Sequence, residues 1–235
     1  MLAPRRFICS SFLSMLLVAL GCGQPAVEQT EPATTHAAAS EAEATPLPGA
    51  RAKVILVPLR SFPDDLLVAV EQALETELAV EVEVHAPVEL PEAAYYPPRK
   101  RYRADALLDF LDSYAADAGI DPSVKLLGLT EVDISTTSEP HEDWGIFGLG
   151  RSPGQSAVVS SKRLSRRPKN REHVRFRLAT TSVHEIGHTF GLPHCQEEQA
   201  GCVMLDAEGG IENTDANTGK LGPSCAKKLE YLTLF

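Results

Sequence analysis

Three histidines and a glutamate lie within one short segment of the chain, VHEIGHTFGLPHC at residues 183–195. On a helix, His184 and His188 would project from the same face, one turn apart, because they are four residues apart. Neutral imidazoles placed in this way can bind one metal ion, and zinc is a metal that such ligands favour. We therefore predict a metal site on a helix that covers about residues 174–190.

A third ligand requires the chain to turn back after this helix. Gly191 can adopt the left-handed conformation that ends a helix, and Pro193 prevents the helix from continuing. His194 could then reach the same ion. Three protein ligands leave a tetrahedral zinc with one open position for water, which is typical of catalytic zinc sites.

The glutamate next to the first histidine predicts the chemistry. A zinc ion lowers the pKa of its bound water to about 7. Glu185 would take the proton of that water as it attacks a peptide carbonyl, and would then pass the proton to the leaving amine. Two surface histidines on a helix can also have no function, but the longer pattern HExxHxxGxxH makes that interpretation much weaker.

The elements around this segment predict an α/β fold. Apolar or alternating runs indicate strands, and apolar residues at helical spacing after Pro63 and after Arg103 indicate two helices. Two strand and helix units followed by consecutive strands favour one mixed, twisted sheet with helices packed against it. The expected strands are VILVPL at 54–59, VEVEVHA at 80–86, VKLLGLTEVDI at 124–134, WGIFGLG at 144–150 and SAVVSSKRL at 156–164.

The N-terminal segment resembles an export signal. Residues 1–21 contain two arginines and then an apolar run, and LVALGC resembles the lipobox of bacterial lipoproteins, in which Cys22 would be acylated. Residues 22–50 are rich in Ala, Glu, Pro and Thr and predict a disordered tether before a folded unit at 51–235. We expect a lipid-anchored protein of the bacterial cell envelope, or a secreted one if Cys22 is not acylated. A net charge of −10 argues against nucleic acid as a partner.

Residues 53–235 also resemble the archaemetzincins, a family of metzincin metallopeptidases. The resemblance rests on HEIGHTFGLPHC and CVM, and on the collinear segments RYRADALL, GLTEVDI, IFGLG, VVSSKRL and LGPSCAKKL. It implies one compact catalytic domain with a small C-terminal subdomain, which acts on a peptide or protein substrate. We expect this domain to be a monomer. His184, His188 and His194 match the family's zinc ligands and Glu185 its general base.

Two further features follow from this resemblance. Met204 matches the methionine that lies under the metal site in metzincins, although by itself it could equally be an ordinary core residue. The segment WGIFGLG is the candidate for an edge strand along which an extended substrate could lie.

The cysteines depart from the family pattern. Archaemetzincins carry four cysteines that bind a second, structural zinc, whereas this chain matches three of them, Cys195, Cys202 and Cys225, and has Gly222 at the position of the fourth. A closed structural zinc site requires four ligands. A second zinc completed by Asp206, Asp215 or water, and a disulfide between two of the cysteines, both remain open.

Two hypotheses about function follow. The first is a zinc-dependent peptidase, which the presence of Glu185 favours. The second is a non-catalytic, zinc-stabilised module that binds peptides or proteins, which the incomplete cysteine set favours. The basic residues between Lys162 and Arg177 are expected to form a solvated surface, or else to attract acidic peptide segments.

Overall fold

The structure, a computed structural model, describes residues 51–196, 201–207 and 209–233. The predicted signal peptide at 1–21, Cys22 and the predicted tether at 22–50 lie outside the described residues.

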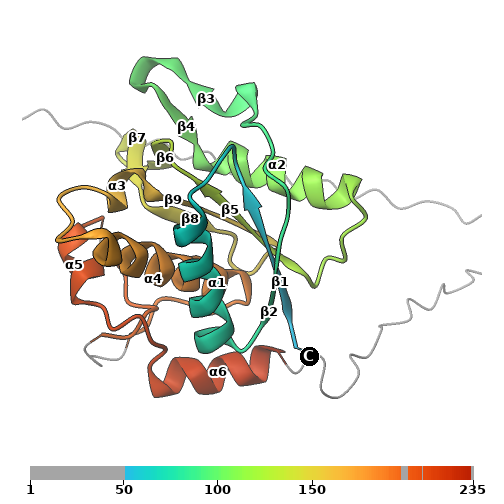
Figure 1. Ribbon diagram of the computed structural model, residues 1–235, viewed down its shortest axis with the longest axis vertical. Helices are drawn as coiled ribbons and strands as arrows, with labels where there is room; N and C mark the ends of the chain where they lie inside the picture. Colours follow the sequence, from blue (N-terminus) through green and yellow to red (C-terminus); the bar gives the residue numbers. More distant parts are fainter. Residues whose placement is uncertain (1–50, 197–200, 208, 234–235) are drawn as a thin grey trace, which may run out of the picture. The chain divides into compact units, whose positions relative to one another are not determined.

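A five-stranded sheet forms the centre of the described part (Figure 1). Its strands are, in spatial order, β2 (Glu81–Val84), β1 (Lys53–Pro58), β5 (Lys125–Thr130), β9 (Ser156–Ser160) and β8 (Gly148–Gly150). The first four run parallel, and β8 runs antiparallel to β9 at one edge. The sheet is therefore mixed, and the predicted α/β fold class is confirmed.

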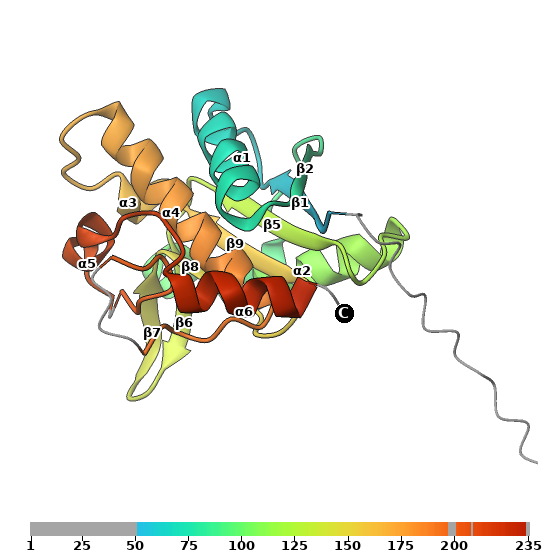
Figure 2. The same cartoon turned by 90° about the horizontal axis from the view of Figure 1, so that it is seen from below.

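Three helices cover the two faces of this sheet: α1 (Asp64–Leu78), α2 (Ala104–Asp117) and α4 (Arg171–Thr189). Figure 2 shows α1 and α4 on one side and α2 on the other. Successive residues of a strand point to opposite faces. Accordingly, Val54 and Leu56 of β1 pack in the core with α1 and α4, whereas Ile55 and Val57 pack in the core with α2.

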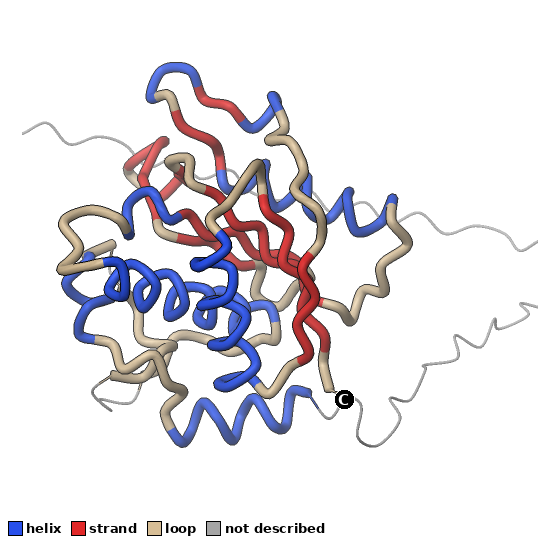
Figure 3. The backbone as a smooth tube through the Cα atoms, in the orientation of Figure 1, coloured by secondary structure: helices blue, strands red, loops and turns tan. Residues whose placement is uncertain are grey.

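A smaller sheet lies beside the main one, in the order β3-β4-β6-β7 (Figure 3). One short 3-10 turn precedes β3, and a second connects β3 to β4. These elements are η1 (Glu92–Ala94), β3 (Tyr95–Tyr96), η2 (Pro97–Arg99), β4 (Arg101–Arg103), β6 (Ile134–Ser138) and β7 (His141–Ile146).

We predicted that the segment WGIFGLG forms one strand, but it is divided between two strands. Its first part completes β7, where Ile146 pairs with Ile134, and its second part is β8, where Gly148 pairs with Val159 of the main sheet. The chain changes sheets at Phe147, whose carbonyl accepts a hydrogen bond from the Ser160 amide. An apolar run cannot reveal such a change, because both halves have strand character.

The strand predicted at 156–164 is also shorter than expected. It ends at Ser160, and α3 (Ser161–Leu164) follows. The Ser160 hydroxyl accepts a hydrogen bond from the Lys162 amide and so caps this helix.

Two helices follow α4: α5 (Ile211–Ala216) and α6 (Pro223–Thr233). Cys225 and Leu229 of α6 belong to the same buried cluster as the inner faces of α1 and α4. The C-terminal part thus packs against α4, through α5, and against the loop that follows α4, through α6.

Candidate metal centre

The predicted metal-binding helix is α4. The Asn170 side chain accepts a hydrogen bond from the His173 amide at its N-terminus, and Leu178, Val183 and Ile186 are buried in the core. The helix ends at Thr189, and Gly191 has a φ of +93°. The amide of Leu192 returns to the Gly187 carbonyl, so the chain reverses as the sequence predicted.

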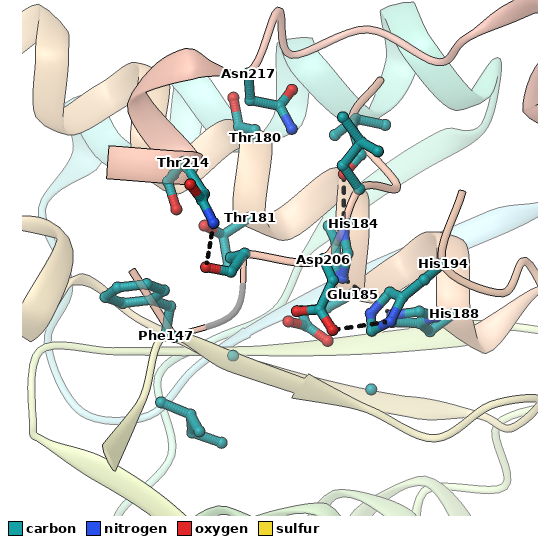
Figure 4. Close-up of a pocket in the computed structure, with 18 of the residues that line it drawn as sticks. Phe147, Thr180, Thr181, His184, Glu185, His188, His194, Asp206, Thr214 and Asn217 are labelled. Atoms are coloured by element: carbon teal, nitrogen blue, oxygen red, sulfur yellow. Dashed lines mark hydrogen bonds and ion pairs between the residues drawn. The ribbon is translucent and has the colours of Figure 1, made fainter. Parts of the chain in front are cut away.

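This reversal brings the three histidines together. Candidate ligand atoms of His184, His188 and His194 all lie within 4.8 Å of one another, and the Nε2 atoms of His184 and His188 are 3.0 Å apart (Figure 4). Nδ1 of His184 donates to the Val203 carbonyl and Nδ1 of His188 to the Leu192 carbonyl, each at 2.8 Å, if these rings carry their proton there. Both Nε2 lone pairs then face the space between the rings.

The protonation of these rings suits a metal site. Burial lowers the pKa of His184 to about 4 and also lowers the pKa of His188. Both rings are therefore neutral near pH 7. Neutral imidazoles whose second nitrogen is held by a carbonyl are typical zinc ligands, so these residues fit the ion.

Glu185 lies beside this centre, between α4 and β8. Its side chain is buried, and a Cβ atom placed on Gly148 would lie 2.7 Å from its Cγ. Burial raises the pKa of Glu185 to about 8, and a hydrogen bond from the Gly150 amide opposes this shift. A divalent cation nearby would also lower it.

Met204 lies against α4 at Gly187, in the helical turn between His184 and His188. It is fully buried, and a Cβ atom on Gly187 would lie 2.6 Å from its sulfur. Its carbonyl accepts a hydrogen bond from the Cys195 amide at 2.8 Å, which ties this turn to the loop that carries His194.

The three cysteines form a second cluster. The sulfurs of Cys195, Cys202 and Cys225 lie within 4.8 Å of one another, and in the described part of the chain none of the three forms a disulfide. Burial raises the pKa of Cys225 to about 12. The backbone amide of Gly222 donates to the Cys202 sulfur at 3.2 Å.

Neither aspartate considered for this cluster is part of it. Asp206 lies beside His194, with Oδ2 3.4 Å from its Nδ1, and Asp215 accepts two hydrogen bonds from Arg177. No spacing or pattern in the sequence predicts these pairings.

A cavity of about 670 Å³ opens at the metal centre. It runs along α4 toward Thr180 and Thr181 and is bounded by Thr214 and Asn217 (Figure 4). The edge strand β8 forms another wall.

Part of the basic run is buried in ion pairs, which differs from the expected solvated surface. Arg177 is 2% exposed and also donates to the carbonyls of Leu164 and Arg166. Arg163 pairs with Asp133 at 2.6 Å.

A mixed sheet, two helical histidines with a third on the next loop, and a buried glutamate together define the class of zinc-dependent hydrolases. The family model of peptidase family M54 matches residues 55–231. The chain belongs to this family, the archaemetzincins, and is therefore a zinc metallopeptidase with peptide substrates.

The chain is similar in sequence and in fold to known archaemetzincins. The archaemetzincin of Thermococcus kodakarensis is 30% identical over 185 residues, which are 75% of this chain and 94% of that protein. The crystal structure of the Methanopyrus kandleri archaemetzincin has a TM-score of 0.65 and 30% identity, and the match covers 79% of this chain and 97% of that chain. The crystal structure of the Archaeoglobus fulgidus archaemetzincin in complex with malonate has a TM-score of 0.61 and 27% identity. This match covers 75% of this chain and 99% of that chain.

The predicted localisation is contradicted by these relatives. We expected an exported protein of the bacterial cell envelope, anchored through Cys22 or secreted, but the curated relatives are archaeal archaemetzincins. Within the described residues, we find no helix with the length and apolar character needed to cross a membrane.

Proposed function

We propose that His184, His188 and His194 hold the catalytic zinc ion and that Glu185 is the general base for peptide-bond hydrolysis. The observation that carries this proposal is the convergence of three imidazoles in one cavity, next to a buried carboxylate. When bound, the zinc ion would supply an acidified water and polarise the substrate carbonyl.

The chain's own residues would then move the proton. Glu185 would accept the proton from the attacking water and donate it to the leaving nitrogen. Its place against Gly148 and the Gly150 amide fixes the carboxylate at the wall of the cavity. The resulting products are a carboxylate and an amine.

The substrate would lie along β8. This strand is the edge of the main sheet and also lines the cavity, so its outer backbone groups can pair with an extended peptide. A peptide bound along this strand would have a carbonyl group next to the proposed metal site and to Glu185.

We further propose that Cys195, Cys202 and Cys225 hold a second, structural zinc, with a water molecule as the fourth ligand. Their sulfurs already lie together, and an amide that donates to sulfur, as Gly222 does, orients a thiolate ligand. This ion would connect the loop after His194 to α6. Two zinc ions per native chain and one per Cys225→Ser chain are expected by elemental analysis, and one ion in both would contradict this assignment.

The test of the catalytic proposal compares the native chain with Glu185→Gln on a mixed peptide library, read by mass spectrometry. Glu172→Gln is the matched control, because Glu172 is an exposed glutamate of the same helix. We expect the native chain and the control to cut peptides. Glu185→Gln should retain its zinc but make no cuts. Full activity of zinc-loaded Glu185→Gln would exclude Glu185 as the base.

A further inference from the structure

The three histidines of the metal centre are oriented by different kinds of partner. His184 and His188 are on α4, and each has Nδ1 next to a backbone carbonyl. His194 lies on the loop after the helix, and its side chain is 39% exposed. Its Nδ1 faces the carboxylate of Asp206 at 3.4 Å, as Figure 4 shows.

The position of Asp206 follows from the turn that carries it. The Val203 carbonyl of this turn accepts from His184, and the Met204 carbonyl accepts from the Cys195 amide. The Met204 sulfur packs against Gly187, between the two helical histidines. One short segment therefore contacts both the helix and the loop that supply the ligands, and Asp206 is its next polar residue.

Asp206 also places negative charge toward the centre. Among the described residues that line the cavity, Glu185 and Asp206 are the two with a carboxylate side chain. Oδ2 of Asp206 lies 3.4 Å from Nδ1 of His194, one of the three proposed ligands. Negative charge at this distance favours a divalent cation.

We propose that Asp206 is a positioning residue that accepts a hydrogen bond from Nδ1 of His194 and thereby turns Nε2 of that ring toward the metal. This inference rests on the proposed function, because it assumes that the three histidines hold the catalytic ion. Asp206 is not one of the residues whose ligand atoms lie within 4.8 Å of one another, so it acts through His194 and not as a direct ligand.

The role explains why the third ligand can come from a loop. A helix fixes two imidazoles by its own geometry, but a loop histidine has more rotational freedom and needs a second contact to hold its ring. Loss of such an outer partner typically lowers metal affinity by about 10- to 100-fold.

The experiment uses the full chain and the variants Asp206→Ala and Asp206→Asn. The matched control is Asp117→Asn, an exposed aspartate of α2. Zinc affinity is measured by competition with a chromophoric chelator, and the histidine site is followed separately by the visible bands of the cobalt-substituted protein. Metal-free thermal unfolding shows whether each variant folds.

We expect Asp206→Ala to bind the metal about 10- to 100-fold more weakly at the histidine site, with altered cobalt bands. Asp206→Asn should bind at least as well as Asp206→Ala, because its amide oxygen can still accept the hydrogen bond. At saturating zinc, kcat should fall more than KM rises.

Two results would overturn the proposal: a zinc affinity of Asp206→Ala within twofold of the native value, or an equal loss in Asp117→Asn. Metal binding is measured without a substrate, so it tests Asp206 even if no peptide is cleaved. Cleavage by the native chain together with an unchanged affinity of Asp206→Ala would refute the role of Asp206 alone.

Discussion

Replacement of Arg177 by methionine should destabilise the protein strongly. Its guanidinium is almost fully buried and donates to both carboxylate oxygens of Asp215, at 2.6 and 2.8 Å, and to two backbone carbonyls at 2.9 Å. Methionine fills a similar volume but supplies no donor. The variant therefore tests the hydrogen bonds and the ion pair rather than the packing.

The magnitude can be worked out from these contacts. Loss of one partner of a buried ion pair costs about 3–5 kcal/mol. The Asp215 side chain is 32% exposed and keeps its contact with His173 at 2.7 Å, so water and His173 offset part of this loss. We therefore expect a loss at the lower end, about 3 kcal/mol. In a domain of this size that corresponds to a fall in Tm of roughly 6–12 °C.

Arg175→Met is the control, because Arg175 pairs with Asp65 at 3.1 Å but its side chain is 35% exposed. A pair that is this accessible to water contributes little to stability. Thermal and urea unfolding followed by circular dichroism would measure both variants. If Arg177→Met loses no more stability than Arg175→Met, the hydrogen bonds between Arg177 and Asp215 do not hold α5 against α4, and our reasoning is wrong. Asp215→Asn combined with Arg177→Met should recover part of the loss, because it removes the unpaired carboxylate.

Three other predictions concern the same region. In Gly150→Ala, the new Cβ would lie 2.5 Å from the Glu185 carbonyl oxygen, so thermal unfolding should show a loss of about 1–3 kcal/mol. Hydrogen bonding to Arg177 lowers the pKa of Asp215 from 3.8 to about 2, so this carboxylate stabilises the fold fully above about pH 4 and progressively less as the pH falls through 2. Urea unfolding with a chelator present should therefore show a smaller loss between pH 4 and 2 in Asp215→Asn than in the native chain. The cavity has no lysine or arginine among its described lining residues, so peptides with acidic side chains next to the scissile bond should be cut more slowly than matched neutral peptides, as mass spectrometry of paired substrates would show.

The parts of the site that the sequence predicted are those set by local geometry. A four-residue spacing places His184 and His188 on one face of any helix, and Gly191 followed by Pro193 ends that helix in any fold. The apolar patterns of β1, α1 and α2 are equally local, since each repeats with the period of its element. For these elements, tertiary contacts do not change the secondary structure that the local pattern predicts.

The missed features depend on contacts between distant residues. Arg177 and Asp215 are 38 positions apart, and no periodicity relates them. A basic run before a helix normally indicates a solvated surface, and only the packing of α5 against α4 shows that part of it is buried. The division of WGIFGLG between two sheets is similar, because it depends on which strands lie on either side of Phe147.

The same distinction applies within the catalytic motif. HExxHxxGxxH contains the proposed ligands and the proposed base, but the groups next to these side chains belong to other segments: the Val203 carbonyl, the Gly150 amide and the Asp206 carboxylate. A chain that kept the motif and lost the turn at 203–206 would therefore still have the ligand side chains, but two of the three rings would no longer be held in place. For this reason, substitutions in that turn should impair metal binding more than substitutions of similar size on the exposed face of α4, although the turn contains no proposed ligand of the catalytic ion.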